Sequence, residues 1–298
     1  MKILITGSSG FIGQHLINSL KYYYELVCPT EQELDIRDGE RVAEYVTVHR
    51  PDYVIHLAAK TEVAWSFHQY EEYTRTNYLG TVHLAEACRY NRDFKRFIFA
   101  SSMETYGEQP AGIPFTEDTP QNPRAPYAVA KLAAEKYLMY MHYAYGFPYT
   151  ILRQTNAYGR TNTTFFVMER IISQMLDGEV VNLGEPEPWR NFLFIDDLME
   201  LYSHVLVKDK ALNQVFVTGP NNALSISDLV TVCADVLQWK GEVNWHTIPK
   251  RVGEVYYLNS DPAKTERLLG WKPKTELKDG IRKTADRILA ARQVGKAA

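Results

Sequence analysis

The chain has 298 residues, of which 45% are hydrophobic, so it can bury a large core in one large or two closely packed domains. Its net charge is −3 and no apolar run approaches the roughly 18 residues of a membrane helix, which gives no electrostatic case for nucleic acid and predicts no membrane association. The three cysteines, Cys28, Cys88 and Cys233, are isolated and lack zinc spacing, so we expect buried apolar side chains, no metal site and a cytoplasmic protein.

The N-terminal stretch has the pattern of a buried strand, residues 2–6, followed by a glycine-rich turn and a helix that reaches about residue 20. Because a strand comes first, we expect no signal peptide. Glycines at every third position favour a dinucleotide-binding turn over a plain tight turn, since they allow close approach to phosphate and close packing of the helix on the strand. The predicted cofactor contacts here are Gly7, Gly10, Phe11, Ile12 and Gly13.

A second strand is predicted near residues 25–29, and an acid at the end of this strand usually binds the free 2′-hydroxyl of NAD. Neither an acid nor an arginine directly follows it; only Glu31, if it points inward, favours NAD, and NADP stays open. Asp35 and Ile36 are expected in a loop that closes over the adenine, where Asp35 accepts amino protons. The alternative role for Asp35, the N-terminal cap of the next helix, fits Asp38 better.

The third predicted strand, residues 52–59, ends in small side chains that would let the backbone lie against the cofactor. The predicted contacts there are Leu57, Ala58 and Ala59. Residues 71–89 have helical apolar periodicity. Asn77 lies inside this helix, where a polar residue is slightly unfavourable unless its side chain makes a local hydrogen bond.

The next strand ends in polar residues of the kind that catalysis uses. An apolar run at residues 96–100 predicts a buried parallel strand, and Ser101, Ser102 and Glu104 follow where that strand should end. Two hydroxyls and a carboxylate are thereby expected at the edge of the sheet where the dinucleotide-binding turn also lies.

After a Pro-rich loop, a helix is predicted to begin near residue 126, with Tyr127 and Lys131 one turn apart on one face. This pair suits proton transfer coupled to hydride transfer. A tyrosine has a pKa of about 10, and lowering it by about three units requires roughly 4 kcal/mol of preferential phenolate stabilisation. A lysine ammonium, a serine donor and an oxidised nicotinamide could supply it together. Taken alone, the same spacing also occurs by chance on surface helices.

Further strands follow at residues 149–153 and 214–218, with a helix at 165–176 and a strand–helix unit over 190–197. Strands that alternate with helices at this period predict an α/β fold with a doubly wound parallel sheet.

The ordered set of motifs resembles the extended short-chain dehydrogenase/reductases, specifically their nucleotide-sugar epimerase/dehydratase branch. The matching segments are Gly7-x-x-Gly10-x-x-Gly13, His56-Leu57-Ala58-Ala59, Asn77-x-x-Gly80-Thr81, Ser101-Ser102-x-x-x-Tyr106-Gly107, Tyr127-x-x-x-Lys131, Arg190-Asn191-Phe192 and Arg251-x-Gly253-Glu254. The resemblance implies a Rossmann-like NAD(P)-binding domain, residues 1–159 plus about 191–218. A smaller nucleotide-sugar-binding domain would comprise about 160–190 plus 219–298.

The resemblance also implies roles. Tyr127 would take the proton of a sugar hydroxyl, Lys131 would hold the cofactor ribose and lower the Tyr127 pKa, and Ser102 would hydrogen-bond the same hydroxyl. Asn77 and Ser101 would join the cofactor site, whose ligand would be NAD with NADP not excluded. The implied contacts to the nucleotide sugar are Asn156, Arg190, Arg251 and Glu254. A homodimer through a four-helix bundle of residues 71–89 and 127–145 is a further implication.

The exact reaction depends on Met103 and Glu104. Dehydratases that this chain resembles carry an acid or Ser followed by Glu at these positions. Glu104 could remove the C5 proton in a 4,6-dehydration, but Met103 has no proton to give to the departing hydroxyl. The leading hypothesis is therefore transient C4 oxidation of a nucleotide-diphosphate hexose, leaning to 4,6-dehydration. The alternatives are 4-epimerisation, NAD(P)H-dependent reduction of a 4-keto sugar and, last, a non-catalytic nucleotide sensor. Sugar, base and any acid replacing Met103 stay open.

Overall fold

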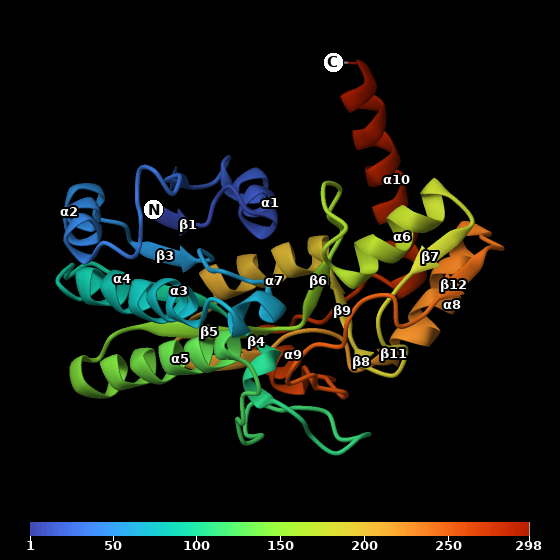
Figure 1. Ribbon diagram of the computed structural model, residues 1–298. Coiled ribbons are helices and arrows are strands. Elements are labelled where there is room, and N and C mark those ends of the chain that lie inside the picture. The colour runs from blue at the N-terminus through green and yellow to red at the C-terminus, as the bar shows by residue number, and fades with distance from the viewer. Residues whose placement is uncertain (298) are drawn as a thin grey trace.

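The computed structural model describes residues 1–297, and a six-stranded parallel sheet forms its centre (Figure 1). In spatial order the strands are β10 (Gln214–Val217), β5 (Tyr149–Gln154), β4 (Arg96–Ser102), β3 (Tyr53–His56), β1 (Lys2–Thr6) and β2 (Glu25–Val27). The predicted doubly wound parallel α/β sheet is confirmed. Strand β4 is two residues longer than predicted, because Ser101 and Ser102 pair with β5.

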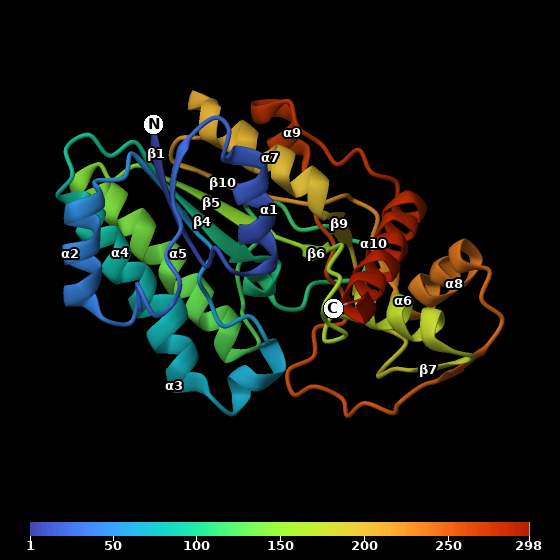
Figure 2. The ribbon, with the colours of Figure 1, turned by 90° about the horizontal axis from the view of Figure 1, so that it is seen from above.

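Helices cover both faces of this sheet, as the view from above shows (Figure 2). One face carries α2 (Gly39–His49), α4 (Gly80–Arg89) and α5 (Pro126–Tyr145), and the other carries α1 (Phe11–Leu20) and α7 (Ile195–Val207). Successive strand residues alternate between the two layers. Leu4 packs with the α2, α4 and α5 layer, whereas Ile3 and Ile5 pack with the α1 and α7 layer. Apolar residues on both faces explain why the strands have no polar alternation.

The strand order places the crevice that this fold uses for ligands. Strand β2 lies on one side of β1, and β3, the next strand in the chain, lies on the other side. Ligands of open parallel sheets bind beyond the carboxyl ends of the strands at such a reversal. The same edge of the sheet carries Thr6 at the end of β1, His56 at the end of β3 and Ser102 at the end of β4.

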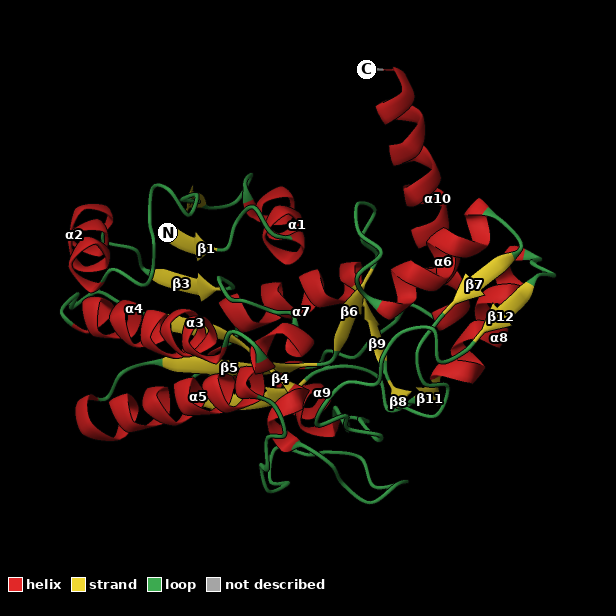
Figure 3. Cartoon of the chain, viewed as in Figure 1, coloured by secondary structure: helices red, strands yellow, loops and turns green. Residues whose placement is uncertain are grey.

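A smaller group of elements lies at the end of the molecule opposite α2 (Figure 3). Its strands form pairs, namely β6 (Asn156–Tyr158) with β9 (Phe192–Phe194), β8 (Trp189–Arg190) with β11 (Leu224–Ser225), and β7 (Val180–Asn182) with β12 (Glu242–Asn244). Its helices are α6 (Val167–Asp177), α8 (Ile226–Leu237) and α10 (Leu277–Ala297), which pack on one another. The short helix α9 (Ala263–Leu269) packs near β10.

The predicted helix over residues 71–89 is present, but it is not α-helical throughout. It consists of α3 (Tyr70–Tyr73), a π-helical segment over Thr74–Leu79, and α4. Short π segments occur often at functional sites. Asn77 lies in this segment and is completely buried. Over residues 1–297, no helix combines the length and apolar character needed to cross a bilayer.

Candidate active site

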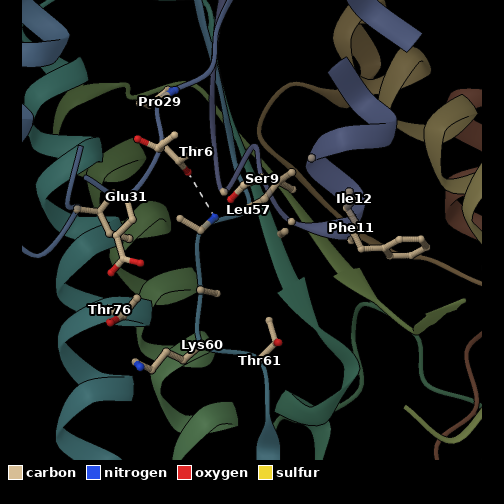
Figure 4. A pocket seen from close by; sticks show the side chains of 18 of the residues that line it. Thr6, Ser9, Phe11, Ile12, Pro29, Glu31, Leu57, Lys60, Thr61 and Thr76 are labelled. Carbon is tan, nitrogen blue, oxygen red and sulfur yellow. Dashed lines mark hydrogen bonds between the residues drawn. The ribbon is translucent and has the colours of Figure 1, made fainter. Parts of the chain in front are cut away.

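A cavity of about 570 Å³ lies beyond the carboxyl ends of β1, β2 and β3. Figure 4 shows Glu31 and Thr76 on one side of it and Phe11 and Ile12 on the other. Nearly all of the predicted cofactor contacts line it. They are Gly7, Gly10, Phe11, Ile12, Gly13, Asp35, Ile36, Leu57, Ala58, Ala59, Ser101, Tyr127 and Lys131.

The glycine turn at the start of α1 is shaped for close backbone approach. Gly7 has a φ of +71°, and a Cβ atom there would lie 2.6 Å from the backbone nitrogen of Ala58. A Cβ at Gly13 would lie 2.4 Å from the carbonyl oxygen of Gly7. The first turn of α1 has no side-chain cap and no acidic residue, so its N–H groups are available to an anion. The turn therefore fits the diphosphate of a dinucleotide.

Asn77 is the one predicted cofactor residue that does not line this cavity. Its amide donates to the carbonyl oxygen of Lys60 (2.9 Å) and accepts from the Lys60 backbone nitrogen (2.8 Å). The side chain is thereby occupied by the loop after β3, whose residues 57–61 line the cavity. Asn77 thus holds the loop that forms the cavity wall, and its own side chain does not line the cavity.

The part of the cavity that is lined by the loop after β2 contains an arginine that the sequence pattern missed. The Arg37 guanidinium holds Asp35 (Nε–Oδ1 2.8 Å) and lowers the pKa of that carboxyl. It also lies 3.0 Å from Glu31 and 3.2 Å from Glu72. No arginine directly follows β2 in the sequence. The loop after β2 folds so that Arg37 lies beside Glu31. Three carboxylates satisfy this arginine, which leaves little free charge for a 2′-phosphate.

Tyr127 lies where the first cavity meets a second one of about 340 Å³, since it lines both. Ser102 and Glu104 line the second cavity, and Lys131 lines the first. The Lys131 ammonium donates to the carbonyl oxygen of Ala100 (2.8 Å). The structure therefore brings all four predicted catalytic side chains together, from the end of β4 and the first turns of α5.

Burial dominates the protonation of this group. It raises the pKa of Tyr127, against which a hydrogen bond with Ser102 works, while the nearby Glu104 raises the pKa further. Burial also lowers the pKa of Lys131 to about 7, with Glu135 acting in the opposite direction. The lowered Tyr127 pKa implied by the resemblance is therefore not produced by the protein chain alone, because Lys131 faces Ala100 and is itself desolvated.

Met103 and Glu104 both lie in the short 3₁₀ turn Met103–Tyr106, but their surroundings differ. Met103 is buried in an apolar cluster with Tyr106 and Phe115 and does not line the second cavity. Glu104 lines that cavity and lies 3.5 Å from the Arg251 guanidinium. Met103, where the resemblance to dehydratases implies an acid or a serine, therefore lies in the core and not in the cavity.

The predicted substrate residues also converge. Glu254 accepts from Arg190 (2.6 Å) and from Arg251 (3.0 Å). Both arginines line the second cavity and an adjoining one of about 320 Å³, as does Asn156, whereas Glu254 lines only the adjoining one. The Arg251 Nε is buried without a partner within residues 1–297. Two guanidinium groups at the junction of two cavities suit a diphosphate.

Two further features had no signal in the sequence. Arg160 lines both the first and the second cavity, but it follows Tyr158 and Gly159 as a lone arginine. Glu135 is completely buried and pairs with Arg153 (2.9 Å) behind the catalytic residues. In the part of the chain that the structure describes, no group of three or more His, Cys, Asp or Glu side chains is arranged to hold a metal ion.

Comparison with known proteins gives matches over nearly the whole chain. A family model described as the NAD dependent epimerase/dehydratase family matches residues 3–219. Human dTDP-D-glucose 4,6-dehydratase is 30% identical to this chain. The alignment is 319 residues long and covers 96% of this chain and 89% of the human protein. The structure of Thermotoga maritima UDP-glucose 4-epimerase with UDP-glucose matches with a TM-score of 0.89 at 29% identity, over 98% and 100% of the two chains. The structure of the Thermus thermophilus UDP-glucose 4-epimerase in complex with NAD matches with a TM-score of 0.88 at 27% identity, over 98% of this chain and 100% of that chain.

Proposed function

This chain belongs to the NAD-dependent epimerase/dehydratase family, as its motifs predicted, and is an NAD-dependent enzyme; we propose that it transiently oxidises C4 of a nucleotide-diphosphate hexose, with 4,6-dehydration as the outcome. The observation that carries the proposal is the position of Tyr127, which lines both cavities. A base at this junction can reach a sugar hydroxyl in one cavity while a hydride acceptor lies in the other.

The roles of the side chains follow from the cavities they line. NAD, when bound along the glycine turn, supplies the hydride acceptor. Tyr127 takes the proton of the C4 hydroxyl, and Ser102, which lines the second cavity beside Tyr127, holds that hydroxyl in line. Lys131 lines the cofactor cavity one helical turn away and binds the ribose next to the nicotinamide. Phenolate formation then depends on positive charge arriving with the cofactor, because the chain by itself raises the Tyr127 pKa.

The second and adjoining cavities receive the nucleotide sugar in this proposal. Arg190 and Arg251 bind its diphosphate, and Asn156 contributes an amide at the same place. A solved relative holds UDP-glucose, which supports a ligand of this class. We accordingly propose a cofactor-binding domain of residues 1–159 plus about 191–218 and a nucleotide-sugar-binding domain of about 160–190 plus 219–298, with Asn156 of the first domain reaching the sugar-nucleotide cavities.

Dehydration is favoured by the carboxylate of Glu104. It lines the second cavity together with Tyr127, so it can remove the C5 proton once C4 is a ketone. A second candidate function, 4-epimerisation, is favoured by the burial of Met103, because no acid from that position can protonate the departing C6 hydroxyl. If dehydration occurs, Glu104 must pass the C5 proton to the departing C6 hydroxyl, which leaves as water; the hydride removed from C4 then ends on C6, and C5 takes a proton from solvent.

We also propose that two copies associate through α5. This helix exposes Val129, Tyr140 and Tyr143, with Leu79 exposed on the neighbouring π-helical segment. Large apolar and aromatic side chains on one helical face are typical of an interface between subunits. Sedimentation equilibrium of the protein and of the Tyr140→Glu variant tests this, and a monomeric wild type would contradict it.

The reaction is tested by incubating the purified enzyme with UDP-, dTDP-, GDP- and CDP-glucose in deuterium oxide. Deuterium at C5 with loss of the C6 hydroxyl indicates dehydration, and inversion at C4 without deuterium at C5 indicates epimerisation. We expect dehydration without net NADH formation. Steady NADPH consumption with a 4-keto sugar would contradict both proposals. Mass spectrometry of nucleotides that copurify with the protein selects which substrates to examine first.

A further inference from the structure

Arg160 is a cationic side chain that has no role in the reaction proposed above. It lies in the segment between β6 and α6, and it lines both the cofactor cavity and the second cavity. Asn162 and Thr163 from the same segment line only the cofactor cavity. This segment is therefore part of the wall that the two cavities share.

The Arg160 guanidinium is held in one orientation from several sides. It stacks between the rings of Phe11 (4.2 Å to the centroid) and Phe166 (3.8 Å). Its Nη1 donates to the carbonyl oxygen of Ala157 and to Glu169 (3.3 Å). The Glu169 carboxylate is completely buried and also accepts from the backbone nitrogen of Arg160 (3.1 Å). Such a group loses little conformational entropy when it binds an anion.

The contact with Phe11 places this cation at the diphosphate-binding end of the cofactor cavity. Phe11 is the first residue of α1, directly after the glycine turn whose N–H groups suit a dinucleotide diphosphate. Four cationic side chains within residues 1–297 line the cavity, namely Arg37, Lys60, Lys131 and Arg160. Arg37 is held by carboxylates at the adenosine end, and Lys131 by Ala100 near Tyr127. Arg160 is the one that packs on the first residue of α1.

The guanidinium keeps donors for a ligand. Nη1 carries its hydrogen bonds within the described residues, whereas Nε and Nη2 make none there and the side chain is 11% exposed. Burial lowers the pKa of Arg160 from its ordinary value, and Glu169 opposes this. An arginine stays protonated under such a shift, so its planar fork remains a phosphate donor at neutral pH.

We propose that Arg160 binds the diphosphate of the dinucleotide. The segment between β6 and α6, which leads into the proposed sugar-nucleotide domain, then also contacts the cofactor. A sugar nucleotide also carries a diphosphate, and Arg160 lines its cavity too. The cofactor is the assigned ligand because Phe11 fixes the guanidinium beside the glycine turn. The inference concerns NAD binding and does not depend on which reaction the second cavity supports.

The test is isothermal titration calorimetry of the full-length enzyme with NAD, ADP, adenosine and UDP, together with the NAD content after purification. R160Q should weaken NAD and ADP roughly 10- to 100-fold, the range for one charge-assisted hydrogen bond. Adenosine has no phosphate and should bind as before, and UDP should change less than about threefold. R282Q, which removes an exposed cation on α10, is the control for net charge.

The ion-pair partner provides the second arm, since R160Q alone leaves a buried carboxylate and can destabilise the fold. E169Q retains Arg160 and should bind NAD and ADP about as the wild type does. The double variant R160Q/E169Q removes both charges, so no buried carboxylate is left unpaired, and it should lose as much ADP affinity as R160Q. If the double variant binds ADP like E169Q, the proposal is wrong. If UDP is weakened instead, the bound diphosphate is that of the sugar nucleotide and the assignment to NAD is overturned.

Discussion

The Glu104 carboxylate and the Arg251 guanidinium lie 3.5 Å apart in the wall of the second cavity. Arg251 is also bound to Glu254 at 3.0 Å, and both members of the Glu104–Arg251 pair are mostly buried. The proposed base, Glu104, is therefore paired with Arg251, one of the two arginines proposed to bind the diphosphate. A diphosphate that binds Arg251 would compete with Glu104 for it, which would release the carboxylate when the substrate is in place.

Glu104→Gln tests the role of this carboxylate. The amide cannot remove a C5 proton, so we expect dehydration to fall at least about 100-fold, a typical loss for a general base. Reversible oxidation at C4 should survive, because Tyr127 is unchanged. The measurement is deuterium incorporation at C5 beside the rate of hydride exchange between C4 and NAD. Undiminished dehydration by this variant would exclude Glu104 as the base.

Tyr127→Phe removes one oxygen at the junction of the two cavities. We expect turnover to fall about 10²- to 10⁴-fold while NAD and nucleotide-sugar affinities change little, because the ring still fills its buried position. Tyr23→Phe is the matched control, since Tyr23 is 78% exposed and lines neither cavity. Rapid-quench measurement of C4 oxidation distinguishes the two, and residual activity close to wild type would show that another group takes the proton.

Asn77→Ala tests the support of the cofactor cavity wall. The variant removes hydrogen bonds to both backbone groups of Lys60 and leaves them without these partners. We expect a loss of about 1–3 kcal/mol in the free energy of unfolding and weaker NAD binding. Urea unfolding and NAD titration measure the two effects. Unchanged stability together with unchanged NAD affinity of Asn77→Ala would argue against this support.

The buried Lys131 makes stability depend on pH. Its pKa is about 7 in the folded protein and about 10.5 in the unfolded chain, so between these values the unfolded chain binds the proton that the folded protein has lost. The free energy of unfolding contributed by Lys131 is therefore lowest below pH 7 and rises towards pH 10.5, by at most about 1.4 kcal/mol per pH unit. Urea unfolding at pH 6–9 should show wild type gaining on Lys131→Met as pH increases. A constant difference would contradict this, and the exposed Lys136→Met is the control.

The Glu135–Arg153 pair should be costly to break from one side. Both side chains are almost fully buried, at 0% and 3% exposure, with a 2.9 Å contact. Arg153→Met leaves Glu135 charged without its partner, and we expect a loss of about 3–5 kcal/mol in the free energy of unfolding. Glu135→Gln/Arg153→Met removes both charges and should recover part of this loss. Chemical denaturation of the three proteins gives the coupling, and a double variant less stable than Arg153→Met would contradict the argument.

Local sequence alone determined the sheet, the glycine turn and the tyrosine–lysine pair. Strand β1 with its glycines and helix α5 with Tyr127 and Lys131 depend on hydrophobic periodicity and on residues at most four apart. Residues so close in the sequence keep nearly the same spatial relationship in any helix or strand. Patterns of this kind can therefore be predicted without knowing the fold. The order of the motifs added the family and NAD, but neither the sugar nor the reaction.

Only the tertiary structure decided which side chains meet. Arg37 returns to Glu31 across a loop, Arg160 reaches Phe11 from a distant segment of the chain, and Met103 turns into the core while Glu104 does not. The physical reason is that these contacts depend on loop paths and on packing between layers, which no short-range pattern specifies. The spacing of residues in the sequence thus identified the candidate catalytic side chains, and the tertiary structure determined which charged groups surround them.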